Sequence, residues 1–335
     1  AAPLLGRTFD ARGAVEAWIR GELPAVGRDR DLAAFGGLEV ALLDLAGRRL
    51  GFSLADVLAT PGSAPGPALP PGPALPPGPA LPPGVIIGFE VETEGLRKHC
   101  IALRFAGRTH VKVKVGRPDD CERLRAIAKV LGPAVPLRLD ANATWTVDEA
   151  VERLLAFKEA LEGVPIASIE QPVEPRDLAG MRAVHERTGV AVMADEAVCS
   201  LADADAIVAA GAAQIFNVRP GKHGGVLGSL AIVQRAREAG LGLHLGTLVG
   251  ESGVLSRVAE VFGRCLSAVA GFACLDGKGQ NRFLLEEDVL RAPTDDANDP
   301  AVAAPLDAPG LGVDVDPQVI ARYRLGEPVE LRATP

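Results

Sequence analysis

The sequence predicts an α/β protein built on a (β/α)8 barrel of the TIM type. Eight short runs rich in β-branched and apolar residues follow one another from residue 85 onward, and amphipathic stretches separate most of them. Several runs end on a charged residue, as barrel strands do where they meet a site. A doubly wound open sheet is the alternative fold. It needs a glycine-rich phosphate loop after an early strand, and the sequence has none.

Composition narrows the classes of function. The net charge is −8 with acids and bases interleaved, and no basic run suits nucleic acid. No apolar run reaches about 18 residues and the chain does not open like a signal peptide, so we expect no membrane contact and a cytoplasmic location. The five cysteines are scattered without a CxxC pair, as buried thiols of a reducing compartment are. Assembly into a homo-oligomer stays open.

A helical region precedes a proline-rich segment. Residues 32–51, LAAFGGLEVALLDLAGRRLG, repeat apolar residues three and four apart and stop at glycine, which is the pattern of a buried helix. Residues 61–84 contain the unit PGPALP three times. Proline fixes φ and lacks a donor, so we expect a polyproline-like surface linker there, with neither helix nor interior strand. A ligand for an SH3-type domain is the less favoured interpretation.

Residues 85–280 are predicted to form the barrel. The expected strands are, in order, VIIGFEV, HVKVKVG, PLRLDAN, IASIEQP, VAVMADEA, QIFNVRP, LGLHLGT and SAVAGFACLDG. The clearest helices between them are DDCERLRAIAKVLG, TVDEAVERLLAFKEAL and GSLAIVQRAREAG. Aromatic residues make up only 4% of the chain, so Ala, Val, Leu and Ile must fill the core, which suits helices packed on a parallel sheet.

Three carboxylates end consecutive expected strands: Asp140, Glu170 and Asp195. A buried strand gains nothing from an unpaired carboxylate, and in a closed barrel the three would converge on one point. Oxygen ligands without cysteine or histidine favour Mg²⁺ over zinc, with Mn²⁺ as the alternative ion. Helix caps and rim ion pairs are the structural alternative for these acids.

Two lysines, Lys112 and Lys114, alternate along HVKVKVG and therefore share one face of their strand. In a barrel, one face of each strand points inward. A lysine beside Mg²⁺ and a second ammonium loses proton affinity and can act as a base near neutral pH. A solvated lysine face would suit an antiparallel sheet rather than this parallel one.

The motifs KVKVG, LDAN, IEQP, ADEA and GKHGG, in this order and spacing, resemble the enolase superfamily. More narrowly, they resemble its muconate-lactonising subgroup, which includes muconate cycloisomerases, o-succinylbenzoate synthases and dipeptide epimerases. The resemblance runs from Leu32 to Tyr323. It includes ALLDLAGRRLG before the barrel and PGLGVDVD after it.

The resemblance implies a site and a reaction. It implies that the metal is bound by Asp140, Glu170 and Asp195 and that the acid/base is Lys114. It also implies that Lys112 binds the substrate carboxylate and that Asn142 and Glu196 support these residues. The implied reaction abstracts the proton α to the carboxylate of a small substrate, and Mg²⁺ stabilises the enediolate.

The resemblance also implies a capping domain. Relatives open with a three-stranded meander that forms a cap over the barrel mouth together with C-terminal segments, and this chain begins close to the helical part of that cap. We therefore expect a partial, N-terminally truncated capping domain. The expected division is residues 1–60 for its helical part, 61–84 for the linker, 85–280 for the barrel and 281–335 for a segment that returns to the cap.

One residue departs from the subgroup pattern. The sixth strand commonly ends K-x-x-x-x-G-G, and here the same spacing gives Arg219-Pro-Gly-Lys-His-Gly-Gly. Arg219 thus stands in place of the second catalytic lysine. Arginine keeps its proton, so two-base racemisation is disfavoured and one-base chemistry by Lys114 is expected. Lys222 is the alternative second base, although its register favours a loop or rim position.

The favoured function is cycloisomerase-type chemistry on a small carboxylate. An o-succinylbenzoate synthase-like syn-dehydratase is the alternative among enzymes, and a catalytically impaired or non-catalytic relative is the alternative outside them. Lys222, His244 and Asp276 are predicted to line the substrate pocket. A core histidine is an equally good interpretation of His244.

Overall fold

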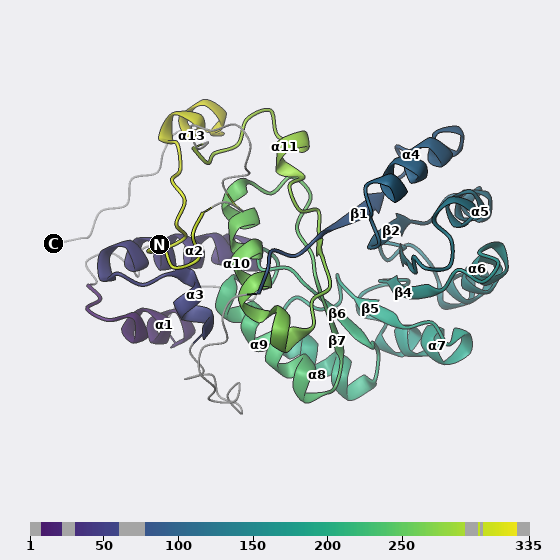
Figure 1. The fold of residues 1–335 in the computed structure, drawn as a ribbon. Helices are drawn as coiled ribbons and strands as arrows, with labels where there is room; N and C mark the ends of the chain where they lie inside the picture. Colours follow the sequence, from purple (N-terminus) through teal and green to yellow (C-terminus); the bar gives the residue numbers. More distant parts are fainter. Residues whose placement is uncertain (1–7, 22–30, 60–77, 292–300, 302–303, 327–335) are drawn as a thin grey trace.

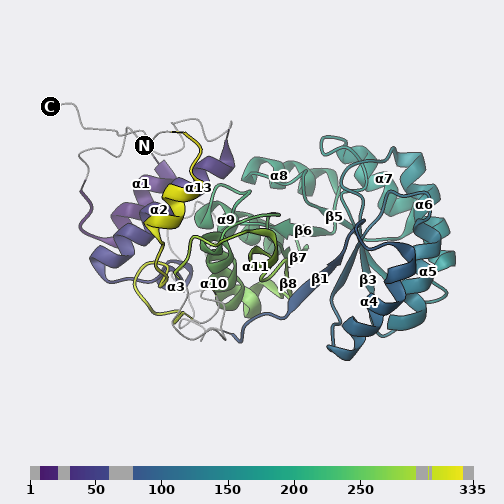
Figure 2. The same cartoon turned by 90° about the horizontal axis from the view of Figure 1, so that it is seen from above.

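Eight parallel strands close into a barrel in the order in which they follow along the chain. The computed structural model describes residues 8–21, 31–59, 78–291, 301 and 304–326. The strands are β1 (Pro83–Ile87), β2 (Val111–Lys114), β3 (Leu137–Asp140), β4 (Ile166–Glu170), β5 (Val192–Ala194), β6 (Ile215–Val218), β7 (Gly242–Leu245) and β8 (Leu275–Asp276). The predicted (β/α)8 fold is confirmed (Figures 1 and 2).

Helices connect successive strands and pack outside the barrel (Figure 2). They are α4 (Thr93–Phe105), α5 (Asp120–Leu131), α6 (Val147–Ala160), α7 (Leu178–Thr188), α8 (Leu201–Ala210), α9 (Val226–Glu238) and α10 (Gly253–Ala270). The predicted helices at α5, α6 and α9 are present. Thr146 and Ser200 begin α6 and α8 with capping boxes. In each box the side chain of the capping residue accepts the N–H of the third helical residue, and the acid at that third position accepts the N–H of the capping residue.

The last strand is shorter than predicted. Residues 267–277 were expected to be extended, but α10 takes the first four of them and β8 keeps only Leu275 and Asp276. Helical spacing prevails because Phe262 and Leu266, one turn apart, are both buried in the core. Gly271 then ends the helix in the left-handed conformation, with φ of 67°. The strand prediction was wrong for residues 267–274.

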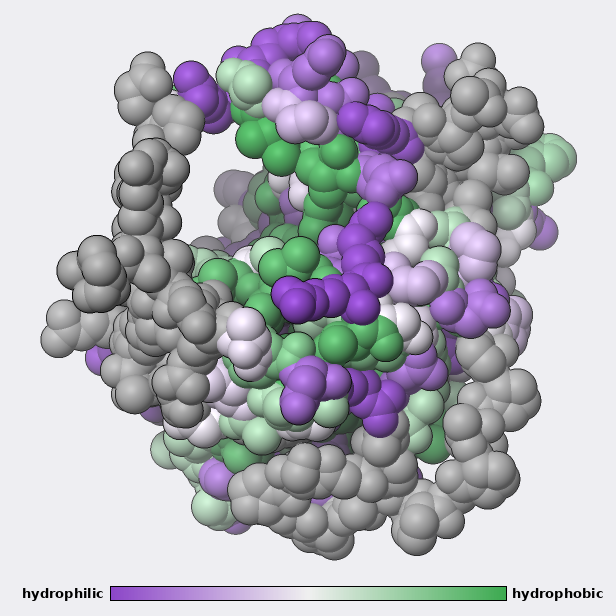
Figure 3. Space-filling view, turned by 90° about the vertical axis from the view of Figure 1, so that its left-hand side faces the viewer, coloured by the Kyte–Doolittle hydropathy of each residue, from purple (hydrophilic) through white to green (hydrophobic). Residues whose placement is uncertain are grey.

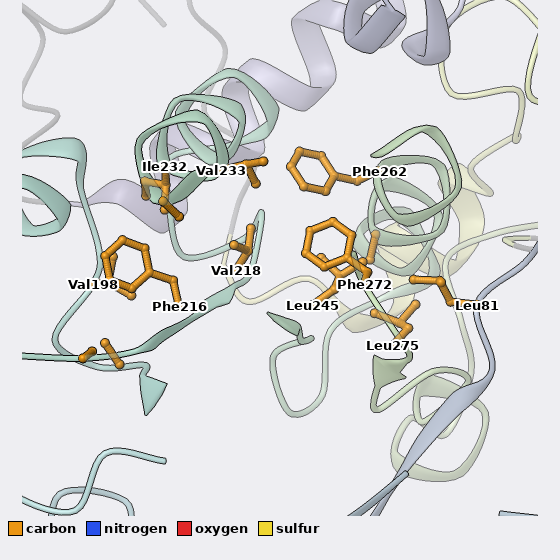
Figure 4. Packing of buried hydrophobic residues seen from close by; sticks show 14 of the residues in the cluster. Leu81, Val198, Phe216, Val218, Ile232, Val233, Leu245, Phe262, Phe272 and Leu275 are labelled. Carbon is orange, nitrogen blue, oxygen red and sulfur yellow. The ribbon is translucent and has the colours of Figure 1, made fainter. Parts of the chain in front are cut away.

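The proline-rich segment ends inside the core. Leu81 is 7% exposed and lies near Leu275 in the packed apolar layer shown in Figure 4. The carbonyl of Pro82 accepts the N–H of Leu275 at 3.0 Å, and Pro83 opens β1. Proline is tolerated at the first position of a strand because it need not donate there. The prediction of a surface linker was therefore wrong for residues 81–84, and the repeat up to residue 77 lies outside the described residues.

The apolar core lies between the strands and the helices. Along β6, Phe216 and Val218 point outward and pack with Ile232 and Val233 of α9 (Figure 4). All four side chains are 0% exposed. Asn217 lies between the two strand residues and points to the opposite side, into the barrel, because successive side chains of a strand alternate. The outer face of the sheet therefore holds the fold together, which leaves the interior for polar groups.

A second group of helices lies on one side of the barrel. It comprises α1 (Arg12–Gly21), α2 (Leu32–Leu50), α3 (Leu54–Ala59) and α13 (Pro317–Tyr323), with α11 (Asn281–Leu284) on the path to α13 (Figure 1). The predicted helix at α2 is present. The C-terminal part joins this group through Gly310, whose N–H donates to Phe52 O and whose carbonyl accepts from Leu54 N. Segments from both ends of the chain thus pack together.

Figure 3 looks at the side that carries these outer helices, where hydrophobic and hydrophilic residues lie interspersed. Leu45 of α2 is 66% exposed, and Ile320 and Tyr323 of α13 are also exposed. Within the described ranges, no helix is long and apolar enough to cross a membrane.

Candidate active site

The inside of the barrel is polar at the carboxyl ends of the strands. Lys114, Asp140 and Glu170 stand side by side in register on β2, β3 and β4. Asp195 follows β5 directly, and Arg219 follows β6. Asp140, Glu170 and Asp195 are each at most 2% exposed. The structure therefore brings the three predicted metal ligands to one end of the barrel, where barrel enzymes place their sites.

Lys112 lies among carboxylates, deeper than Lys114. Its Nζ is 3.1 Å from Glu170 Oε2, 3.2 Å from Asp140 Oδ2 and 3.8 Å from Asp276 Oδ2. Burial alone would lower the pKa of Lys112, but Glu170 and the other two acids outweigh it and raise the pKa. Lys112 is therefore a fixed cation that neutralises the inner acids.

Arg219 and Lys222 supply the remaining positive charge. Arg219 Nη2 is 3.0 Å from Glu170 Oε1 and 2.5 Å from Asp195 Oδ2. Lys222 Nζ is 2.6 Å from Asp195 Oδ1, on the other oxygen. Lys222 lies in the loop after β6, as its register predicts, but the turn after Arg219 folds its side chain back onto Asp195 and away from the rim. Through these contacts, acids and cations alternate in space in the order Asp140, Lys112, Glu170, Arg219, Asp195 and Lys222.

These contacts shift the pKa of two acids in opposite directions. Burial raises the pKa of Glu170, and the carboxylates of Asp140 and Asp195 add to that effect against the opposition of Lys112 and Arg219. Burial would also raise the pKa of Asp195, but Lys222 and Arg219 outweigh it and lower the pKa. Two cations, Lys222 and Arg219, thus favour the charged form of Asp195.

Lys114 lies at the mouth of the barrel and has a different partner. Its Nζ donates to Asn142 Oδ1 at 2.9 Å, and Asn142 Nδ2 donates to Glu196 Oε1 at 3.3 Å. Within the described residues Lys114 forms no ion pair. The predicted supporting residues Asn142 and Glu196 thus connect the lysine to the loop that carries Asp195.

Backbone strain accompanies the strand ends. Asn142 and Gln171 follow the β3 and β4 acids in the left-handed region, with φ of 46° and 36°. The buried Gln171 side chain accepts the N–H groups of Asp195 and Ala197 at 3.2 and 2.9 Å. Gln171 therefore fixes the loop that positions Asp195, a role that sequence spacing does not reveal.

His244 and Asp276 lie below the site, bound to a residue that the sequence analysis missed. Arg138 donates to both oxygens of Asp276, at 2.7 and 2.6 Å, and lies 2.8 Å from His244 Nε2. Burial would raise the pKa of Asp276, but His244 and Arg138 hold it well below its usual range. Burial lowers the pKa of His244, so we assign the counter-charge to Arg138. The alternation in LRLD, which puts Arg138 on the face of Asp140, was the available signal.

Two glycines make room for this packing. A Cβ on Gly84 would lie 1.9 Å from Asp276 Oδ1. A Cβ on Gly246 would lie 2.7 Å from Asn217 Oδ1 and 3.2 Å from Arg219 Nε. Any larger residue would therefore displace a site side chain. Asn217 itself donates to Glu170 Oε1 at 3.0 Å.

Asp140, Glu170 and Asp195 suit a hard divalent cation by their chemistry, since all three offer buried carboxylate oxygens. In the present arrangement Lys112 and Arg219 stand between them. Among the described residues, the ligand atoms that gather within 4.8 Å of one another belong instead to His244, Cys274 and Asp276. Arg138 already supplies the cation of that second group, so a metal ion there would meet a fixed positive charge.

Comparison with known proteins shows a matching family and several similar enzymes. Residues 96–319 match the family described as "Enolase C-terminal domain-like". The chain is 28% identical over 284 residues to L-Ala-D/L-Glu epimerase of Clostridium acetobutylicum, covering 84% of this chain and 72% of that protein. It is 29% identical over 295 residues to muconate cycloisomerase 1 of Pseudomonas putida, covering 87% and 71%. It is 25% identical over 291 residues to o-succinylbenzoate synthase of Bacillus subtilis, covering 87% and 70%.

A solved structure agrees. The dipeptide epimerase from Enterococcus faecalis V583, complexed with Mg and the dipeptide L-Leu-L-Tyr, superposes with a TM-score of 0.70 at 25% identity, over 88% of this chain and 77% of that one. The family match spans most of the chain, and the fold and the order of the motifs agree with it. The chain therefore belongs to the enolase superfamily and, within it, to the muconate-lactonising subgroup.

Proposed function

We propose that the chain catalyses a one-base reaction of the muconate cycloisomerase type, centred on the proton α to the carboxylate of a small substrate. Its superfamily comprises enzymes, and its relatives include a cycloisomerase, a synthase and an epimerase. Asp140, Glu170 and Asp195 would hold Mg²⁺. When bound, the ion supplies the positive charge that stabilises an enediolate.

The observation that carries the one-base proposal is the pair formed by Lys114 and Arg219. Their strands, β2 and β6, are four apart in a closed ring of eight and so lie on opposite sides of the barrel. Two groups in these positions can address the two faces of a substrate held between them. Racemisation by two bases requires both groups to exchange protons.

Lys114 suits the role of the base. It donates to the amide oxygen of Asn142, so moving its proton breaks no ion pair. Lys112 does not suit it, because three carboxylates hold its proton. We therefore assign proton transfer to Lys114 and a neutralising role to Lys112, in place of direct contact with the substrate carboxylate.

Arg219 cannot be the second base. Burial would lower its pKa, but Asp195 and Glu170 raise it, and a guanidinium is already the weakest acid among the side chains. Its charge and its planar fork suit a substrate carboxylate or an enolate instead. The arrangement favours chemistry in which a single lysine moves the proton on one face.

Proton NMR in D₂O tests this assignment. Wild type should exchange the α-proton of its substrate in a panel of N-acyl amino acids, dipeptides and cyclohexadienyl carboxylates, and Lys114→Ala should abolish both exchange and turnover. Lys129→Ala, on the exposed face of α5, is the matched control and should behave like wild type. Racemisation of any panel member by the wild-type protein would overturn the one-base assignment and point to Lys222 as second base.

An o-succinylbenzoate synthase-like syn-dehydration is the second candidate, supported by the similarity over 87% of the chain. It uses the same single base, and it differs because the product loses water, which mass spectrometry detects. A catalytically impaired relative is the third candidate. It predicts that Mg²⁺ binds while no α-proton of the panel exchanges.

A further inference from the structure

Arg219 lies between two of the three site carboxylates. One terminal nitrogen, Nη2, is within hydrogen-bonding distance of both Glu170 Oε1 and Asp195 Oδ2, at 3.0 and 2.5 Å. The two carboxylates are 0% and 1% exposed. A single nitrogen shared by two buried carboxylates occupies the position of a bridging cation.

The other oxygens of these two acids also have partners. Glu170 Oε2 accepts from Lys112 Nζ at 3.1 Å, and Oε1 accepts from Asn217 Nδ2 as well as from Arg219. Asp195 Oδ1 accepts from Lys222 Nζ at 2.6 Å. A divalent cation that binds both acids must therefore replace at least one side-chain cation. Arg219 touches both Glu170 and Asp195, so a cation that bridges these two acids takes the place of its guanidinium.

The guanidinium can leave only as a charged group, because arginine keeps its proton in proteins. Its movement is nevertheless feasible. Arg219 Nε has no hydrogen-bond partner within the described structure, and the side chain is 17% exposed.

We propose that Arg219 is a built-in counter-cation that competes with the divalent metal ion for Glu170 and Asp195. Metal binding then requires the guanidinium to swing out of the site. The inference rests on the metal ligands of the proposed function and adds a residue of this chain that sets their affinity. Arg219 in this position also supplies positive charge to two buried acids.

Calorimetric titration with Mg²⁺ tests the competition directly. Arg219→Gln should bind Mg²⁺ at least about tenfold more tightly than wild type, because the ion no longer displaces a buried ion pair. Arg219→Lys should fall between them, because lysine keeps the charge but lacks the planar fork. Arg182→Gln, whose arginine pairs with Glu186 on the surface of α7, is the control and should match wild type.

Thermal denaturation gives a second readout that needs no turnover. In EDTA, Arg219→Gln should melt below wild type, because two buried acids lose their shared counter-charge, and Mg²⁺ should raise its melting temperature more than that of wild type. If Arg219→Gln fails to fold, Arg219→Lys carries the comparison.

The outcomes separate this inference from the proposed function. Equal Mg²⁺ affinities in wild type and both Arg219 variants would overturn the competition and leave the metal ligands in place. If none of the proteins binds Mg²⁺, the metal site of the proposed function fails, and the competition fails with it.

Discussion

Lys112 and Lys114 stand two residues apart on one strand and face the same way, yet their surroundings give them different chemistry. The inner lysine is 4% exposed and touches three acids, whereas the outer one reaches an amide at the mouth. The motif alone does not tell the two apart, because both lysines satisfy it. The difference comes from depth along the barrel axis, which decides how many strand ends surround each ammonium.

Glu251, in the loop between β7 and α10, gives a prediction at the scale of one residue. It is 8% exposed, and burial raises its pKa to about 7 from the model-peptide value of 4.5. Leu248 N and Ser256 Oγ donate to it, and the charge of Arg219 acts on it, but these effects do not offset burial. Between pH 4.5 and 7 the native carboxyl therefore holds a proton that the unfolded chain has released.

The native state binds more protons in this window, so Glu251 makes stability fall as pH rises from about 4.5 to 7. We expect the stability of Glu251→Gln relative to wild type to rise across that window. The difference in the free energy of unfolding between the two proteins should be about 1 to 3 kcal/mol larger at pH 8 than at pH 5. Urea denaturation of both proteins at several pH values measures the difference. A gap that stays constant with pH would exclude a raised pKa at this residue.

The spacing of hydrophobic residues along the sequence predicted most of the helices and strands. Strands two to seven lie within their predicted segments, and α2, α5, α6 and α9 match their helical patterns. The errors fall where two patterns compete. Residues 267–270 are apolar enough for a strand but continue the buried face of α10, and Pro83 belongs by composition to a linker but opens β1. Local composition could not settle either case, because a distant partner decides each one.

The site was predictable only as far as strand order places it. Alternation and the strand ends pointed to Asp140, Glu170 and Asp195. By contrast, Arg138, Asn217 and the contact of Lys222 with Asp195 depend on which side chains meet across a closed barrel. That pairing follows from the shear of the barrel and from loop folding, and neither is written in the local sequence.

Leu81 shows that the end of the proline-rich segment belongs to the core. It follows two proline-containing repeats yet packs in the core, where a Cβ on Gly263 would come within 2.8 Å of it. We expect Leu81→Ala to lower the free energy of unfolding by about 2 to 4 kcal/mol, because it leaves a cavity beside β8. Leu45→Ala, at a position that is 66% exposed, should change it by less than about 1 kcal/mol. If urea denaturation shows similar losses in the free energy of unfolding for both substitutions, Leu81 belongs to a surface linker and not to the core.

At the scale of the whole molecule, the outer helices are tied to the barrel close to the site. Glu39 of α2 is completely buried and accepts the N–H groups of Val226 and Leu227, at 2.5 and 3.0 Å, across 187 and 188 residues of sequence. These are orphan donors at the start of α9, where a negative charge is favoured. The close approach requires glycine, because a Cβ on Gly225 would lie 1.8 Å from Glu39 Oε2.

The contact matters because α9 begins directly after the turn that carries Arg219 and Lys222. Glu39 therefore fixes the far end of the loop whose near end lies on Asp195. The outer helices thus contribute to the order of the site without entering it. The two hydrogen bonds of Glu39 are part of the contact between α2 and α9.

We expect Glu39→Gln to loosen this loop. A single amide oxygen replaces a charged pair of acceptors, so the free energy of unfolding should fall by about 1 to 3 kcal/mol. Hydrogen exchange at the Val226 and Leu227 amides should accelerate by more than the global loss of stability accounts for. Glu159→Gln, on the exposed face of α6, is the matched control and should leave both amides unchanged. If Glu39→Gln accelerates exchange equally throughout the barrel, the glutamate stabilises the fold as a whole, and α2 does not specifically hold the loop beside Asp195.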